Sequence, residues 1–307
     1  MSGTEVRANR LGVAQVMLSA VIWSTAGLFT RLITADTWTL LFWRSVFGAL
    51  FLMAALVWQE GPGALRAIAT MGWPGWAVAI LSTGIILTYL SALRLTAVAD
   101  VMIIQATLPF VVAGLAWLIM RERASRPTIL ASALATIGVA VMLAGTSLAG
   151  NPWGVTLAFV TTVFYAGLIV LLRWHRDVPM TPAALLAALL GAVVTWPLAQ
   201  PAAVSAADLF YLMVFGASQT GFAFLLLTMG SRLIPATATA LISALETPLA
   251  PVWVWLAFGE VPTTAAMVGG TIVLGAVVGH IVVESRPVPA HRDASGDRIA
   301  RPGSLKG

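Results

Sequence analysis

Residues 94–122, RLTAVADVMIIQATLPFVVAGLAWLIMRE, decide the fold together with residues 232–260, RLIPATATALISALETPLAPVWVWLAFGE. Each stretch begins with Arg-Leu, places Trp-Leu after 21 further residues, and reaches Glu after three more. One offset, 138 residues, aligns all three elements. A second offset, 142 residues, pairs three other positions: Gly12 with Gly154, Trp23 with Tyr165, and Arg31 with Arg173. The chain therefore contains an internal repeat.

The composition around these stretches is that of a membrane protein. Hydrophobic residues make up 59% of the 307 residues and charged residues only 9%, whereas soluble domains average about 25% charged residues. The net charge of +5 does not indicate nucleic-acid binding, because the basic residues lie in short loops and the tail instead of on one aromatic-rich face. Cysteine is absent, which excludes disulfides, thiolate catalysis and cysteine-based metal sites.

Ten apolar segments are each long enough to cross a bilayer, which takes about 20 helical residues. The first has 23 residues, more than the about 7–15 of a signal-peptide core, so we expect it to be a spanning helix. The ten predicted spans are residues 11–33, 37–58, 73–95, 98–119, 127–148, 152–173, 182–199, 207–231, 235–257 and 263–284.

Arginine and lysine are distributed unevenly between the two ends of these spans. With the N-terminus inside, 14 of the 17 basic residues fall inside, Arg31 and Arg94 fall outside, and Arg44 lies within the second span. The positive-inside rule then predicts that both termini are cytoplasmic and that the loop at 145–152 is external. Residues 285–307 are polar and rich in Pro, Arg and Asp, which predicts a disordered cytoplasmic tail.

An odd number of spans per repeat means that the two halves cross the membrane in opposite directions. We therefore expect residues 1–148 to form one five-helix repeat and residues 149–284 to form a second, inverted one. The fold class is an all-α polytopic membrane protein. Inverted repeats are typical of secondary transporters, which bind substrate near the midplane between the halves.

Three features resemble the drug/metabolite transporter superfamily, and within it the EamA branch of small-metabolite exporters. They are Ala-Val-Ile-Trp-Ser at 20–24, Arg44, and a proline followed by Gly-Glu, seen as Pro248 to Gly259-Glu260 and as Pro109 to Arg121-Glu122. Arg121 stands where Gly is usual. The resemblance extends to about residue 284 and implies export of amino acids, their analogues or small drugs. It is strongest to the exporters of aromatic and neutral amino acids.

Two charged residues lie well inside predicted spans. Glu246 is near the centre of the ninth span, and Arg44 is about seven residues into the second, or roughly 10 Å at 1.5 Å per residue. A charge near the bilayer centre costs at least ~2.5–3.5 kcal/mol, so it usually faces protein or a water-filled cavity. In a functional interpretation, Glu246 binds a proton or an amine, and Arg44 binds a substrate carboxylate or acts as a counter-ion. Alternatively the two form a structural pair, or Arg44 extends outward to the interface.

Glu246 is followed by Thr247 and Pro248, and an internal proline removes a backbone hydrogen bond and kinks a helix. Either the carbonyls freed by this kink line a cavity, or the kink only serves packing, which membrane bundles tolerate. The repeat counterpart, Gln105 to Pro109, is polar as well.

Several other polar and aromatic residues at membrane depth are candidates for substrate contact. An unpaired amide is costly in hydrocarbon, which favours a site role for Gln105 and Gln219. Trp23, Tyr89 and Tyr165 lie away from the interfacial aromatic belts and could form cavity walls. The predicted substrate-binding residues are Trp23, Ser24, Arg44, Tyr89, Gln105, Pro109, Phe164, Tyr165, Gln219, Glu246, Thr247 and Pro248.

No catalytic, metal or cofactor site is expected. His175, His280 and His291 are too dispersed for a base or a metal cluster, and no G-x-x-x-x-G-K motif for ATP occurs. The leading hypothesis is a secondary exporter of small amphipathic metabolites in a bacterial inner membrane. The alternatives are a multidrug or cationic-compound exporter of the same fold, a membrane-embedded enzyme, or a passive channel. The expected partners are a small-molecule substrate and the lipid bilayer, with no nucleic acid, and a monomer is compatible with the sequence.

Overall fold

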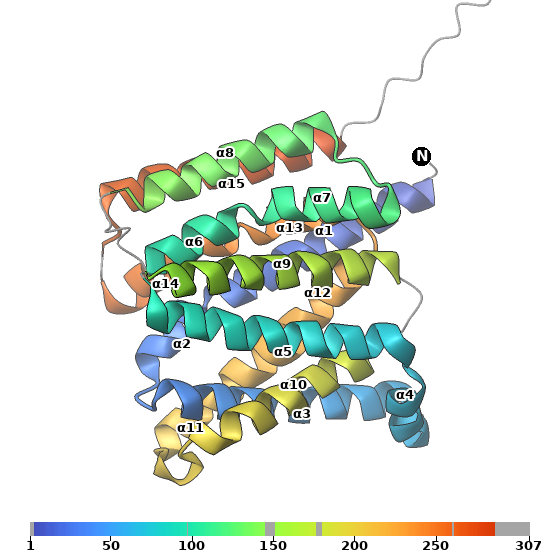
Figure 1. The fold of residues 1–307 in the computed structure, drawn as a ribbon, viewed down its shortest axis with the longest axis vertical. Helices are drawn as coiled ribbons and strands as arrows, with labels where there is room; N and C mark the ends of the chain where they lie inside the picture. Colours follow the sequence, from blue (N-terminus) through green and yellow to red (C-terminus); the bar gives the residue numbers. More distant parts are fainter. Residues whose placement is uncertain (1–2, 97, 145–150, 176–179, 260, 286–307) are drawn as a thin grey trace, which may run out of the picture.

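The helices lie side by side and form one bundle (Figure 1). The computed structural model describes residues 3–96, 98–144, 151–175, 180–259 and 261–285, and the regular elements within these ranges are all helical. The helices of the first half are α1 (Gly3–Ser24), α2 (Ala26–Leu32), α3 (Thr37–Glu60), η1 (Gly61–Gly63), α4 (Ala64–Thr70), α5 (Gly72–Leu95), α6 (Val98–Ala106), α7 (Leu108–Met120) and α8 (Arg126–Met142). Those of the second half are α9 (Pro152–Trp174), α10 (Thr181–Thr195), η2 (Trp196–Leu198), η3 (Pro201–Ala203), α11 (Ala206–Phe215), η4 (Gly216–Ala223), α12 (Phe224–Gly230), α13 (Ala236–Ser243), α14 (Glu246–Phe258) and α15 (Thr264–Ser285).

The all-helical polytopic membrane fold expected from the sequence is confirmed. In the described residues, seven helical stretches are long and apolar enough to cross a membrane, or eight if the bent pair α6–α7 is one span. Every predicted span is largely helical, but α8 has only 17 residues, so the count of ten crossings stays a prediction. The first turn of α1 and the last turn of α15 lie at the same end of the bundle (Figure 1). The predicted outer loop at 145–150 and the tail at 286–307 lie outside the described residues.

Three of the predicted spans are broken part-way along. α6 and α7 meet at Thr107 with a bend of 40°, and α13 gives way to α14 at Ala244 and Leu245. Pro109 and Pro248 lie in the first turns of α7 and α14, where each lacks the N–H that would continue the preceding helix. The regular helix is therefore interrupted just before Pro248, although residues 236–258 still form one continuous apolar stretch, so the kink expected at Pro248 stays a prediction. The third break, between α1 and α2 at Thr25, has no proline and was not predicted.

A fourth irregularity, η4, is a π-helical segment of eight residues between α11 and α12. π-Helical turns are rare and occur often at functional sites. It was not predicted from the sequence, although Gly216 and Gly221 within it weaken a regular helix.

α7 and α14 also end alike. Each has 13 residues and ends in a left-handed residue, Arg121 with φ 57° and Gly259 with φ 71°. Glycine adopts this conformation without strain, whereas other residues rarely do. Arg121 is the only non-glycine with positive φ among the described residues, so the departure from the family pattern lies where glycine is favoured.

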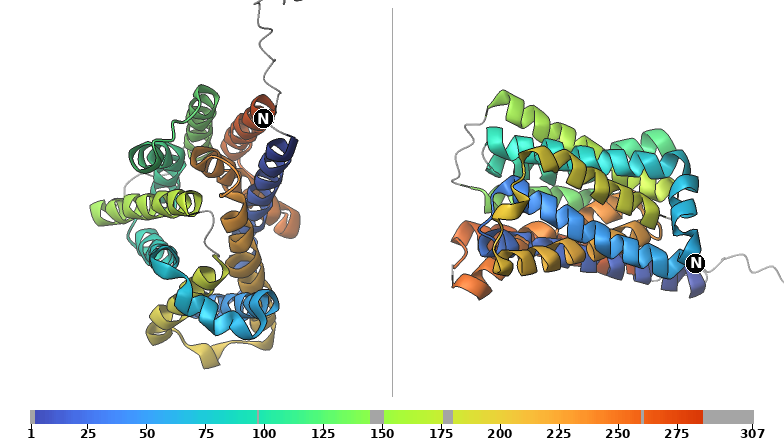
Figure 2. Two further views of the ribbon diagram at one scale, coloured as in Figure 1. Left: turned by 90° about the vertical axis from the view of Figure 1, so that its right-hand side faces the viewer. Right: turned by 90° about the horizontal axis from the view of Figure 1, so that it is seen from below.

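α8 and α15 pack against each other at one edge of the bundle (Figure 2). Their closest approach is at Gly138 and Gly269, where a Cβ on Gly138 would lie 2.8 Å from the Gly269 carbonyl oxygen and 3.0 Å from the Val273 nitrogen. Small residues permit this backbone contact. Gly275 and Gly279 of α15 are instead exposed, and a Cβ there would meet no described atom within 4 Å.

Gly138→Ala is expected to destabilise the protein by about 1–3 kcal/mol, because the new methyl group meets backbone atoms that cannot rotate away. The measurement is the midpoint of thermal unfolding in detergent. Gly275→Ala is the matched control, since it adds the same methyl group to the same helix pair in open space. Equal midpoints for the two variants would contradict this account of the packing.

Candidate functional site

Arg44 and Glu246 lie within electrostatic reach of each other at the centre of a group of elements. Arg44 comes from α3 and Glu246 is the first residue of α14. Both charges also act on Tyr89 of α5, and Glu246 acts on Tyr165 of α9. The structure thus brings together four residues that the sequence placed only by depth.

Arg44 is held on one side by η4 and by Phe215, the last residue of α11. Its Nε donates to Thr220 Oγ1 at 3.2 Å, and its guanidinium carbon lies 5.2 Å from the centroid of the Phe215 ring. A cation over an aromatic face is stabilised by about 0.5–2 kcal/mol, depending on desolvation. Neither terminal nitrogen of Arg44 takes part in a hydrogen bond with any of the described residues. The guanidinium therefore keeps donors for a further anionic group.

Glu246 begins α14, where the positive end of the helix dipole favours a negative charge. The side chain is part-buried, and its carboxylate accepts no hydrogen bond from the residues that the structure describes. Among the described residues, Glu246 and Arg44 do not approach within the 4 Å of an ion pair. The two opposite charges thus attract each other through space without forming an ion pair.

Buried hydroxyl groups add to the unpaired polar atoms around this centre. Tyr165 Oη and Ser243 Oγ are both inaccessible to solvent and lie near enough to interact with each other, yet neither has a hydrogen-bond partner within 3.5 Å among the described residues. Buried polar atoms in native proteins nearly always have partners, so each exception calls for an explanation. A polar substrate or ordered water next to Glu246 would supply one.

The break between α1 and α2 is held by η4. Gln219 Nε2 donates to the carbonyl of Ile22 and to Thr25 Oγ1, both at 3.1 Å, and Trp23 Nε1 donates to the Gln219 carbonyl at 3.0 Å. Both donors of the Gln219 amide are therefore engaged within the protein. Gln219 fixes the break and with it the position of Trp23, instead of presenting a free amide to a substrate.

Ser24 also serves a positioning role. Its Oγ donates to the Val21 carbonyl at 2.6 Å and accepts from Trp253 Nε1 at 2.8 Å, which ties the end of α1 to α14. Trp253 lies seven residues after Glu246, two turns along the same helix face. Trp253, Thr220 and Phe215 contact Ser24 or Arg44 but were not among the predicted residues, and only the helical spacing of Trp253 from Glu246 offered a signal.

The remaining predicted residues are Gln105, Pro109, Phe164, Thr247 and Pro248, and several of them lie in contacts between helices. The Phe164 ring packs where a Cβ on Gly84 of α5 would lie, 2.8 Å away. Pro248 is buried and faces Gly270 of α15, and Pro109 is buried among the residues of α7. Phe164 and Pro248 thus make packing contacts, and the substrate role of all three stays a prediction. Gln105 and Thr247 are part-buried.

A second constellation joins three connections at the end of the bundle where α1 begins. Glu122 Oε1 accepts from the backbone N–H of Ala236 at 3.2 Å, and Glu122 Oε2 lies 3.4 Å from Arg173 Nε. Arg173 also donates to the Arg232 carbonyl at 2.7 Å. We call these four residues the end clamp. It ties the first residue of α13 to the connection after α7 and to the last turn of α9.

The opposite end of the bundle is tied by uncharged donors. Asp208, at the start of α11, accepts from the Thr34 backbone N–H at 3.0 Å and from Thr34 Oγ1 at 2.7 Å. The centre with Arg44 and Glu246 thus lies between two sets of contacts that join the predicted halves.

Sequence comparison now identifies the family. The model of the EamA-like transporter family matches residues 10–144 and again residues 152–282. The chain belongs to the EamA-like transporter family. Two matches of one model along the chain agree with the internal repeat, and the resemblance to the drug/metabolite transporter superfamily is confirmed.

Other proteins resemble this EamA-family chain over nearly its whole length. An "uncharacterized transporter" from Archaeoglobus fulgidus is 26% identical over 285 residues, which cover 89% of this chain and 97% of that protein. A solved crystal structure matches with a TM-score of 0.74 at 19% identity, covering 89% of this chain and 96% of the other. At that identity the likeness shows the fold alone. The family and the relative's name both indicate a membrane transporter and not an enzyme.

Proposed function

We propose that this EamA-family transporter exports small zwitterions with an apolar or aromatic side chain, such as neutral and aromatic amino acids. The observation that carries the proposal is the unpaired couple of Arg44 and Glu246, whose opposite charges act on each other without forming an ion pair. A zwitterion fits this couple, with its carboxylate at Arg44 and its ammonium group at Glu246. Each contact is then a charge-assisted hydrogen bond.

The charges near the centre disfavour more highly charged substrates. A phosphate ester or a dicarboxylate would need several cations in a dry cavity, and Arg44 is the only basic residue placed deep in a span. Trp23, Tyr89 and Tyr165 offer apolar area and ring faces for the side chain of the substrate. The hydroxyls of Tyr165 and Ser243 could bind its polar atoms.

The proposed mechanism is alternating access between two inverted five-helix repeats, residues 1–148 and 149–284. Discontinuous helices at the substrate level are typical of such transporters, and α1–α2, α6–α7 and α13–α14 are discontinuous here. We propose a multi-pass location in a bacterial inner membrane with both termini in the cytoplasm, on the basis of the Arg and Lys distribution.

A multidrug or cationic-compound exporter is the second candidate. It is favoured by the carboxylate of Glu246 lying near aromatic residues, an arrangement that binds organic cations. In that case Arg44 would be a counter-charge and would not contact the substrate. A membrane-embedded enzyme has no comparable support from the described residues.

Proteoliposomes test the proposal directly. We expect saturable counterflow of a neutral amino acid among Phe, Trp, Leu and Thr, and none of glucose 6-phosphate. Saturation and counterflow also distinguish a carrier from a channel. Transport of the phosphate ester with none of the four amino acids would refute the proposal, and transport of an organic cation alone would select the second candidate.

A further inference from the structure

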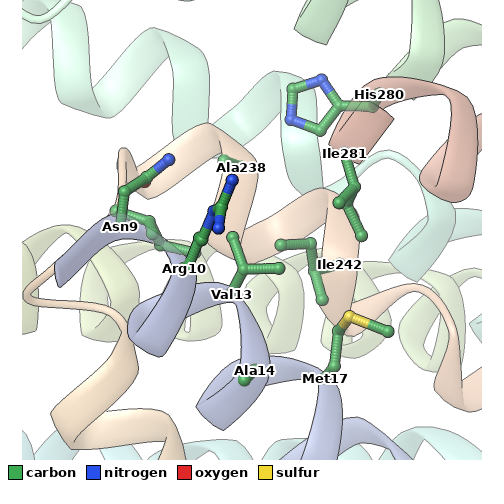
Figure 3. Close-up of a pocket in the computed structure, with 10 residues that line it drawn as sticks. Asn9, Arg10, Val13, Ala14, Met17, Ala238, Ile242, His280 and Ile281 are labelled. Carbon is green, nitrogen blue, oxygen red and sulfur yellow. The ribbon is translucent and has the colours of Figure 1, made fainter. Parts of the chain in front are cut away.

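A pocket of about 160 Å³ lies between α1, α13 and α15, away from the central cluster. In Figure 3, Asn9 and Arg10 of α1 lie on one side of the pocket and His280 of α15 lies across from them, with Val13, Met17 and Ile242 further along α1 and α13. None of its lining residues belongs to the predicted substrate site. Its lining is therefore separate from that site.

Helical periodicity places the lining residues of α1 on one face. Arg10, Val13, Ala14 and Met17 follow the spacing i, i+3, i+4, i+7, so a charged group stands at the head of an apolar stripe. Arg10 is exposed, and His280 across the pocket is 4% exposed. A ligand that fits this face has an anionic head and an apolar continuation.

The surroundings of the pocket are those of a lipid-facing surface. Leu11 and Leu18 of α1 and Val278 and Val282 of α15 are each about half exposed, although all four lie in apolar spanning helices. Such side chains face lipid hydrocarbon in a membrane. A pocket opening beside them is reached from the bilayer as well as from water. A volume near 150 Å³ holds a group the size of benzene, which is enough for part of one lipid molecule.

We propose that this pocket binds an anionic phospholipid. Its phosphate contacts the Arg10 guanidinium and the Asn9 amide, and the start of an acyl chain lies along Val13, Met17 and Ile242. Basic pockets between spanning helices on the cytoplasmic side suit anionic headgroups, and each basic residue near an anionic surface contributes about 1 kcal/mol. Because α13 forms one wall and begins at Ala236, which Glu122 binds, a bound lipid contacts the same helix as the end clamp.

Native mass spectrometry of the full chain tests the proposal. The protein is equilibrated in detergent with dioleoyl phosphatidylglycerol and dioleoyl phosphatidylcholine, which have the same acyl chains but differ in net charge. We expect preferential retention of one phosphatidylglycerol, with Arg10→Gln reducing the preference about five-fold, the factor equivalent to 1 kcal/mol. Ala14→Phe, which fills the pocket and keeps Arg10, should also abolish the preference. Arg66→Gln, which removes an exposed charge on α4 outside the pocket, should leave it unchanged.

Three outcomes would overturn the proposal. The first is equal retention of the two lipids by the wild type. The second is an equal loss of the phosphatidylglycerol preference in Arg66→Gln and Arg10→Gln. The third is displacement of phosphatidylglycerol by millimolar inorganic phosphate. The last would show a site for a soluble anion. Unfolding midpoints of all variants are compared first, and Ala14→Leu replaces Ala14→Phe if the larger side chain lowers the midpoint.

Discussion

Glu246→Gln is expected to lower counterflow of a transported amino acid by about ten- to a hundred-fold. The substitution keeps the shape of the side chain and removes its charge, so the ammonium group of the substrate loses one charge-assisted hydrogen bond. Such bonds contribute about 1.5–3 kcal/mol, which corresponds to that range. Counterflow is measured in proteoliposomes at matched protein content across several pH values, and insertion is checked by the unfolding midpoint.

Glu60→Gln is the matched control, because it makes the same chemical change at an exposed position at the end of α3. It should leave counterflow unchanged. Full activity of Glu246→Gln with an unaltered pH profile would reduce Glu246 to a structural residue.

The double variant Arg44→Gln/Glu246→Gln separates substrate binding from a structural pairing. If the two charges bind opposite ends of one substrate, the double variant transports no better than either single variant. If they only neutralise each other, removing one strands a part-buried charge, and removing both restores folding and transport. Recovery of transport in the double variant would therefore contradict the zwitterion site.

The second large effect concerns the end clamp. Glu122→Gln is expected to weaken the tie between α13, α9 and the connection after α7, because the carboxylate serves both Arg173 and the Ala236 N–H. With the side chain of Glu122 26% exposed, we expect a loss of about 1–2 kcal/mol, which favours opening, the separation of α13 from α9 and from the connection after α7, roughly 5–30-fold.

The natural chain has no cysteine, so a single introduced thiol reports this opening without background. Ala240 lies 1% exposed one turn inside the start of α13. In an Ala240→Cys background, Glu122→Gln should raise the rate of labelling by a membrane-impermeant maleimide about 5–30-fold. Arg123→Gln changes the charge of an exposed neighbour on the same connection and should have no effect. Equal labelling rates for both variants would show that Glu122 does not hold this end of α13 in place.

Part of the fold and of the site was predictable because it depends only on residues that are close together in the sequence. An apolar run of about 20 residues specifies a helix in lipid whatever its neighbours, because every backbone polar group must be satisfied within the segment. A proline interrupts that pattern by lacking a donor, so the break before Pro248 followed from one residue. The depth of Arg44 and Glu246 likewise required only counting along a helix.

Features that depend on contacts across the bundle were not accessible in this way. The break at Thr25 has no proline and is held by Gln219, 194 residues away in the chain. The same contact changes the interpretation of Gln219 from a substrate ligand to a positioning residue. Thr220 and Phe215 contact Arg44 only because η4 and the end of α11 pack on α3.

The amino-acid sequence alone established an all-helical membrane protein with an internal repeat and two charges at depth. Hydropathy, proline and charge act locally, and repeated spacings are visible in one dimension. Only the tertiary structure decided that Arg44 and Glu246 share one centre without pairing, and that Glu122 ties α13 to α9. These outcomes depend on distances between side chains from helices far apart in the chain, which the packing of the whole bundle determines.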